Sequence, residues 1–146
     1  MLLGKSIIFM FIFSFIIQYF LMSLIMTNNN SNIRNSLGKL YLSLIMAFMM
    51  AIVEVIMHDT QHQHLHISYK YYIILGLLLG ILIYFYRTQY LIDDNNYVKE
   101  MIEHHSMALF TSDRIIKKTK NKEVYNLATN IIKSQQEEID LMNKLV

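Results

Sequence analysis

Three long apolar runs divide the first 92 residues of the chain. They cover residues 7–26, 40–57 and 71–86, and polar residues are sparse within them. A helix rises about 1.5 Å per residue, so a run of about 20 residues spans a hydrocarbon core of roughly 30 Å. The third run is short, but tyrosines at both ends suit the two membrane interfaces. The pattern predicts three transmembrane helices in a membrane domain of residues 1–92.

The remaining residues, 93–146, carry apolar positions at intervals of three and four. Asp93 and Asp94 offer a helix N-cap before the first seam. That seam consists of Val98, Met101, Ile102, His105, Ala108, Leu109, Ser112, Ile115 and Ile116. After a turn at residues 119–121, a second seam consists of Val124, Leu127, Ala128, Ile131, Ile132, Gln135, Ile139 and Met142. Two amphipathic helices with a short turn predict an antiparallel hairpin, and the fold class is all-α.

Polar residues interrupt both seams of the predicted hairpin. Pairing the helices about the turn sets His104 opposite Gln135 and Met101 opposite Glu138, with His105 and Gln135 at one level. Buried polar groups need partners. Either a hydrogen bond between histidine and glutamine or a metal site would supply them.

A hairpin of 54 residues leaves its apolar face half covered. We expect it to pair with a second copy into a four-helix bundle, which makes the protein a homo-oligomer, or to pack against the membrane spans. A Gly-x-x-x-Gly step at Gly76 and Gly80 suits a close helix contact in the third span.

Soft metal ligands gather near the start of the hairpin. Met101, His104, His105 and Met107 lie within two helical turns. Thioether and imidazole groups suit copper(I) better than calcium or magnesium, which prefer oxygen. The alternative is structural: one histidine packs in the core, the other faces water, and the methionines fill gaps.

A second group of metal ligands follows the second apolar run. His58, His62, His64 and His66 are four of the six histidines and stand within nine residues. If the helix continues, Glu54, His58 and His62 share a face; if the chain is extended, the last three histidines point to one side. His-rich tracts commonly bind metal ions, so we expect a second metal site. A solvated loop, with Glu54 reaching the membrane interface, is the alternative.

Composition and charge narrow the choice of function. A hydrophobic share of 54% favours a membrane protein, and the lipid bilayer is its first partner. The absence of cysteine excludes disulfides and thiolate chemistry, and a net charge of +2 gives no support for nucleic-acid binding. Arg34, Lys39 and Arg87 outweigh Lys5 and Lys70, which favours a multi-pass protein with a cytoplasmic carboxy-terminal domain.

Several motifs resemble the domain of unknown function 305 (DUF305) family, whose members are ferritin-like helical domains associated with copper handling. The hairpin motifs are Asp94-x-x-Tyr97, Met101-Ile102-x-His104-His105 and Gln135-Gln136-x-Glu138-Ile139-x-x-Met142. The membrane-attached members are also similar at Met49-Met50-x-x-x-Glu54-x-x-Met57 and Arg87-Thr88-Gln89. The resemblance implies half of a ferritin-like four-helix bundle.

The resemblance also implies a set of site residues. Copper would be bound by His104, His105, Met101 and Met142, with Gln135 and Glu138 as supporting groups. The chain differs from the family pattern at Glu103, where proline is usual, and at Thr111, where a methionine is usual; Met107 could substitute from one turn earlier.

We therefore expect a non-enzymatic integral membrane protein that binds copper or a similar metal, with a role in metal homeostasis or sensing. The alternative is a structural or assembly protein whose hairpin drives oligomerisation without metal. A metal-dependent oxidoreductase is disfavoured, because di-iron bundles use Glu-x-x-His pairs and neither Glu100 nor Glu103 stands three residues before a histidine.

Overall fold

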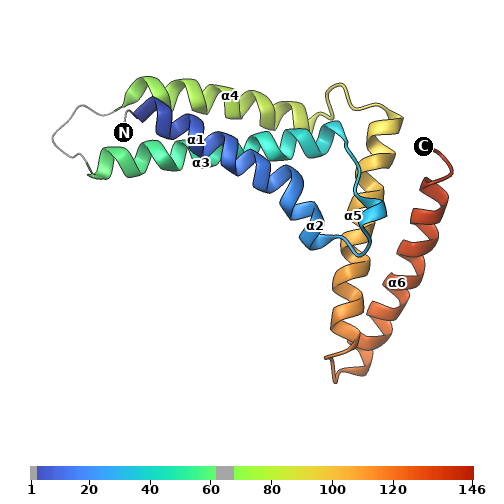
Figure 1. Ribbon diagram of the computed structural model, residues 1–146. Coiled ribbons are helices and arrows are strands. Elements are labelled where there is room, and N and C mark those ends of the chain that lie inside the picture. Colours follow the sequence, from blue (N-terminus) through green and yellow to red (C-terminus); the bar gives the residue numbers. More distant parts are fainter. Residues whose placement is uncertain (1–2, 62–67) are drawn as a thin grey trace. The chain divides into compact units, whose positions relative to one another are not determined.

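The computed structural model describes residues 3–61 and 68–146, and these residues form helices and no strands. The helices are α1 (Leu3–Ile16), α2 (Met22–Met26), α3 (Leu37–Gln61), α4 (Tyr69–Arg87), α5 (Asp94–Ile116) and α6 (Lys122–Met142), with a π-helical turn at Ile17–Leu21 and a 3₁₀ turn at Asn30–Asn32 (Figure 1). The all-α prediction is confirmed.

Three helical stretches are long and apolar enough to cross a membrane, as the sequence predicts. They cover Leu3–Met26, Leu37–Gln61 and Tyr69–Arg87. Each helical stretch begins two to four residues before the apolar run that predicted it. A helix can include polar residues at its ends unless proline or a cap stops it. For the same reason α3 runs one turn beyond residue 57 and includes His58.

The chain divides into two compact units, each described separately here. One unit, hereafter the membrane unit, comprises Met1–Leu21 and Gly38–Leu91. The other, hereafter the carboxy-terminal unit, comprises Met22–Leu37 and Ile92–Val146. Residues 22–37 therefore belong with the carboxy-terminal helices. The first apolar stretch is shared, since α1 lies in the first unit and α2 in the second.

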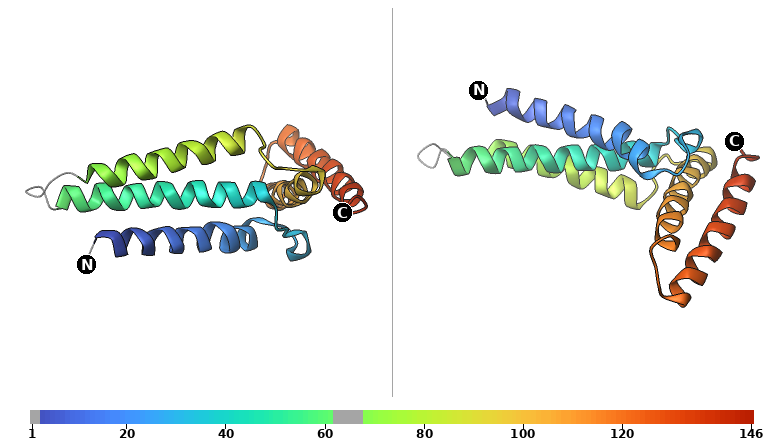
Figure 2. Two further views of the ribbon diagram at one scale, coloured as in Figure 1. Left: turned by 90° about the horizontal axis from the view of Figure 1, so that it is seen from above. Right: turned by 60° about the horizontal axis from the view of Figure 1, so that its bottom comes forward.

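In the membrane unit, α3 lies between α1 and α4 (Figure 2). Small side chains make close packing possible, because Ala47 and Ala51 of α3 are fully buried. Ile7, Ala51, Val55 and Leu75 form the buried cluster that joins the three helices. Large apolar side chains cover the outside, as expected of a surface that faces lipid.

In the carboxy-terminal unit, α5 and α6 lie side by side and antiparallel (Figure 1). Side-chain caps start both helices: Asp93 accepts a hydrogen bond from the backbone N–H of Asn96 (2.7 Å), and Asn121 accepts one from Glu123 (2.8 Å). The buried apolar side chains of the two helices are Ile102, Leu109, Ala128 and Ile139. The ferritin-like character of this hairpin stays a prediction.

Candidate metal-binding sites

His105 and Glu138 meet across the hairpin. The Nδ1 atom of His105 lies 3.0 Å from Oε2 of Glu138, and the two side chains are 15% and 51% exposed. Nδ1 is itself buried and has no hydrogen-bond partner among the residues that the structure describes. The His105 imidazole and the Glu138 carboxylate are thus in contact, but their geometry is not that of a hydrogen bond.

The contact does not overturn the sequence-based pairing of the two helices. That pairing set Glu138 opposite Met101 and His105 level with Gln135, and in the structure the Glu138 side chain lies against His105, one turn along α5 from Met101. Helix side chains lean toward their own N-terminus, so in antiparallel helices the side chains of His105 and Glu138 lean toward each other. The apolar pattern predicts which faces pack, and not which polar side chains meet at their edge. The predicted hydrogen bond between His105 and Gln135 is not made at Nδ1.

Burial favours the neutral form of the His105 imidazole. Desolvation lowers its pKa, and the nearby His104 lowers it too, while the Glu138 carboxylate acts in the opposite direction. A lone pair on Nδ1 would repel the carboxylate oxygen, and a proton or a cation between the two atoms removes this repulsion. The pair is therefore suited to hold a positively charged species.

Two thioethers stand one turn away from this pair along the helices. Met101 precedes His105 by four residues on α5, and Met142 follows Glu138 by four on α6. Both methionines are half-buried. Each member of the pair thus has a methionine one turn along its own helix.

The other predicted ligands differ in exposure. His104 is exposed, because neighbouring residues on a helix point about 100° apart. Met107 and Gln135 are half-buried. Within residues 3–61 and 68–146, no three histidine, aspartate or glutamate side chains are close enough to hold a metal ion together.

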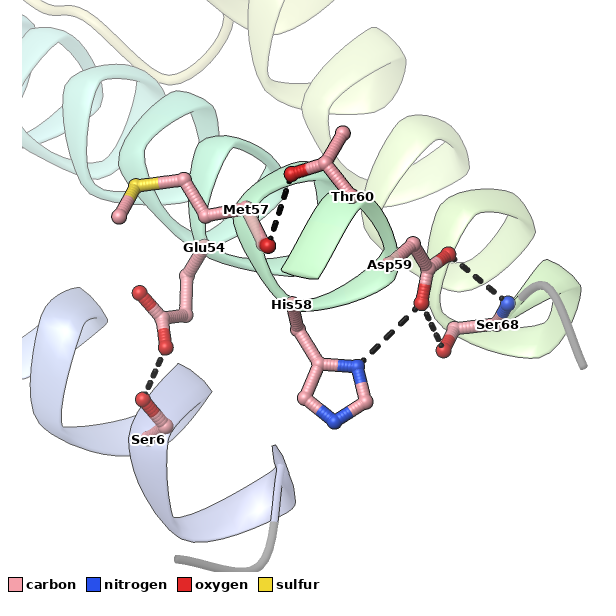
Figure 3. Close-up of polar contacts among 7 residues, drawn as sticks. All are labelled: Ser6, Glu54, Met57, His58, Asp59, Thr60 and Ser68. Carbon is pink, nitrogen blue, oxygen red and sulfur yellow. Dashed lines mark hydrogen bonds and ion pairs between the residues drawn. The ribbon is translucent and has the colours of Figure 1, made fainter. Parts of the chain in front are cut away.

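The second predicted site lies in the membrane unit (Figure 3). The hydroxyl of Ser6 on α1 donates a hydrogen bond to Glu54 on α3. One turn further, Nδ1 of His58 lies 3.3 Å from Asp59, and Asp59 also accepts hydrogen bonds from the N–H (3.0 Å) and hydroxyl (2.8 Å) of Ser68. Glu54 and His58 therefore have different polar partners.

Three further residues of that site, His62, His64 and His66, lie outside the described residues. The hydrogen bonds between Asp59 and Ser68 join the chain on either side of them.

Sequence reasoning missed a polar network on α5. Glu103 is 6% exposed and accepts hydrogen bonds from the Ser23 hydroxyl (2.5 Å) and the Arg34 N–H (2.9 Å). Ser106, fully buried, accepts one from the N–H of Asn28 (3.1 Å). These bonds fix residues 22–37, hereafter the strap, to α5. A glutamate and a serine three residues apart on one side of an amphipathic helix could have indicated a polar contact. Nothing in the sequence identified the partners of these two residues.

Comparison with known proteins yields a relative and a family model. No solved structure matches the chain. An uncharacterized protein of Acanthamoeba polyphaga mimivirus is 43% identical over 83 residues, which are 57% of this chain and 55% of the viral protein. The chain thus spans about half the length of that relative. Residues 93–146, which include both α5 and α6, match the model of the domain of unknown function DUF305, in agreement with the motifs of the hairpin.

Proposed function

We propose that this integral membrane protein binds copper(I) through methionine and histidine side chains of the α5–α6 hairpin and acts in metal homeostasis or sensing. The observation that carries the proposal is the buried Nδ1 of His105, which has no hydrogen-bond partner in the described chain and faces the Glu138 carboxylate at 3.0 Å. A buried polar atom without a partner costs about 1–3 kcal/mol, and a bound cation would remove that cost.

The donor set determines the choice of metal. Met101 and Met142 offer soft sulfur, and a neutral imidazole at His105 offers borderline nitrogen, which together favour copper(I) over magnesium or calcium. Glu138 supplies negative charge beside the imidazole. His104, exposed and next in sequence, is the second candidate imidazole.

The proposal is tested with two single variants, His105→Ala and His104→Ala, in the full-length protein purified in detergent. Each is loaded with copper(I), washed with a competing chelator and analysed for metal by mass spectrometry. We expect His105→Ala to lose most of the copper that the wild type retains, and His104→Ala to keep more of it. Equal copper in all three proteins would contradict a site at the hairpin and would direct attention to His58 and the histidines that follow it.

A specific observation favours the alternative of a structural or assembly protein. A Cβ added at Gly76 or Gly80 would have no other atom within 4 Å, so the Gly-x-x-x-Gly face of α4 is open to a neighbouring helix. This alternative predicts that Gly76→Leu with Gly80→Leu dissociates an oligomer, while the His105→Ala variant leaves the oligomer intact and no copper is retained by the wild type.

We infer a cytoplasmic carboxy-terminal unit from the excess of basic residues at Arg34, Lys39 and Arg87 over Lys5 and Lys70. Labelling of a cysteine introduced at exposed Thr111, in intact and in permeabilised cells, tests this orientation. Labelling only after permeabilisation is expected.

A further inference from the structure

A line of exposed apolar side chains runs along α6 on a face that α5 leaves uncovered. Leu127, Leu141 and Leu145 are 60%, 58% and 66% exposed. The full set of positions follows the three-and-four spacing of a helix seam: Val124, Leu127, Ile131, Ser134, Glu138, Leu141 and Leu145. We call this set the outer seam. Beyond the end of α6, backbone hydrogen bonds from Lys144 and Leu145 continue the last turn.

Apart from Glu138, which contacts His105, the outer seam is separate from the apolar contact between α6 and α5. Ala128 and Ile139, which face α5, are 4% and 1% exposed. Each stands next in sequence to a member of the outer seam, Leu127 and Glu138, and neighbours on a helix point about 100° apart. The helix thus has two adjacent faces, one buried in the hairpin and one open, which is the arrangement of a helix in a four-helix bundle.

The outer seam is complementary to itself in an antiparallel arrangement. Leu127 and Leu141 each stand seven residues from Ser134, so a two-fold axis at Ser134 sets Leu127 of one copy against Leu141 of the other. The charges flanking the seam match as well: Glu123 and Lys144 lie eleven and ten residues from Ser134 and meet across the same axis. In a parallel pair in register, by contrast, Glu123 of one copy and Lys144 of the other would lie at opposite ends of the helix pair and could not meet.

We propose that the outer seam is the docking surface for a second copy of this chain, packed antiparallel about Ser134. The ion pair across the axis is available, because neither Glu123 nor Lys144 makes an ion pair within the described part of the chain. Ser134 places a small polar residue at the centre, where a polar layer fixes register. The two hairpins together then form four helices.

The second copy also reaches the His105–Glu138 pair. Glu138 belongs to the outer seam and lies four residues from the axis, so the nearest outer-seam residue of the second copy is Ile131, three residues from the axis. Ile131 would shield the half-exposed Glu138 carboxylate from water and strengthen its attraction for a cation near His105. The docking surface does not depend on metal binding, so the two proposals can fail separately.

The absence of cysteine from the natural chain makes disulfide cross-linking a direct test. In the full-length protein in detergent or nanodiscs, Ser134→Cys is expected to form a disulfide-linked dimer on mild oxidation. Asn126→Cys, exposed on another face of α6, serves as the matched control and is expected to stay monomeric on denaturing gels. A Ser134→Cys protein that cross-links no better than the control would overturn the proposal.

Direction is tested with two separately tagged variants, Leu127→Cys and Leu141→Cys. In the antiparallel pair, residue 127 of one copy is 14 positions, or about 21 Å, from residue 127 of the other. A disulfide needs Cα atoms within about 7 Å. Only the mixture of the two variants is therefore expected to cross-link; cross-linking of Leu127→Cys with itself would overturn the antiparallel arrangement.

The flanking charges are tested by exchange. Either Glu123→Lys or Lys144→Glu alone brings like charges together at both ends of the dimer. We expect the dimer of each variant to be about tenfold weaker, as measured by sedimentation or light scattering. Combining the two substitutions restores both pairs and is expected to restore the dimer. Monomeric wild-type protein at all concentrations, with the outer seam instead protected by added lipid, would show that this face binds membrane and not a second copy.

Discussion

Replacement of Glu103 by alanine is expected to release the strap from α5. The Glu103 carboxylate is 6% exposed and holds two groups of the strap, the Ser23 hydroxyl at 2.5 Å and the Arg34 N–H at 2.9 Å. The Glu103→Ala variant removes both acceptor oxygens at once. Both donors then lose the carboxylate acceptor, and water replaces it fully only if the strap opens.

The size of the effect follows from these two bonds. A hydrogen bond to a charged group contributes about 1.5–3 kcal/mol. Since donors in an opened strap regain bonds with water, we expect a loss of about 2–4 kcal/mol in the free energy that keeps the strap closed, which is about a 30- to 1,000-fold rise in the open population. The remaining bonds, from Asn28 to Ser106 and from Leu37 to Asn96, limit the loss.

Hydrogen exchange measures this opening directly. The N–H of Arg34 is expected to exchange faster in Glu103→Ala by the factor above, and Glu103→Gln, which keeps one acceptor oxygen, is expected to show a smaller change. Glu137→Ala, an exposed glutamate of α6, is the control and should leave strap exchange unchanged. Unchanged protection of Arg34 in Glu103→Ala would refute the role assigned to the buried carboxylate.

Two further predictions concern the carboxy-terminal unit. Burial lowers the pKa of His105 in the folded state. As the pH falls, the unfolded chain therefore takes up a proton at this residue before the folded chain does. The stability that the neutral His105 contributes is present above about pH 6.5 and declines as the pH falls through the folded pKa. The difference in melting temperature between wild type and His105→Gln should therefore change between pH 7.5 and 5, and a constant difference would contradict the assignment. Asp93→Ala removes the carboxylate that caps α5 by accepting a hydrogen bond from the Asn96 N–H, and should lower the stability of the helix start by about 1 kcal/mol. The Asn96 N–H should then exchange faster with solvent. Asp94→Ala leaves this hydrogen bond intact and should not speed that exchange.

The apolar pattern was sufficient to predict the helices. Three spans and two amphipathic helices follow from apolar spacing, and Asp93 and Asn121 mark helix starts through local hydrogen bonds that depend only on neighbouring residues. The contact of His105 with Glu138 did not follow, because apolar spacing identifies the buried face of each helix and not the polar side chains that meet at its edge.

The strap could not be predicted for a different reason. Its asparagines and serines are typical of a loop, and their partners, Glu103 and Ser106, stand more than 65 positions away in the chain. Burial of a glutamate is unfavourable by composition alone and becomes stable only when donors arrive from elsewhere. Such long-range polar pairing leaves no periodic signal in the sequence.

Two polar residues of α5, separated by one position, differ in whether the rest of the chain satisfies them. Glu103 is buried with donors for both carboxylate oxygens, so its burial is compensated within the chain. The buried Nδ1 of His105 lies 3.0 Å from Glu138 but makes no hydrogen bond within the described residues. A buried polar atom without a hydrogen bond costs about 1–3 kcal/mol, and a bound cation would remove that cost. For this reason the copper proposal rests on His105, whereas Glu103 holds the strap against α5.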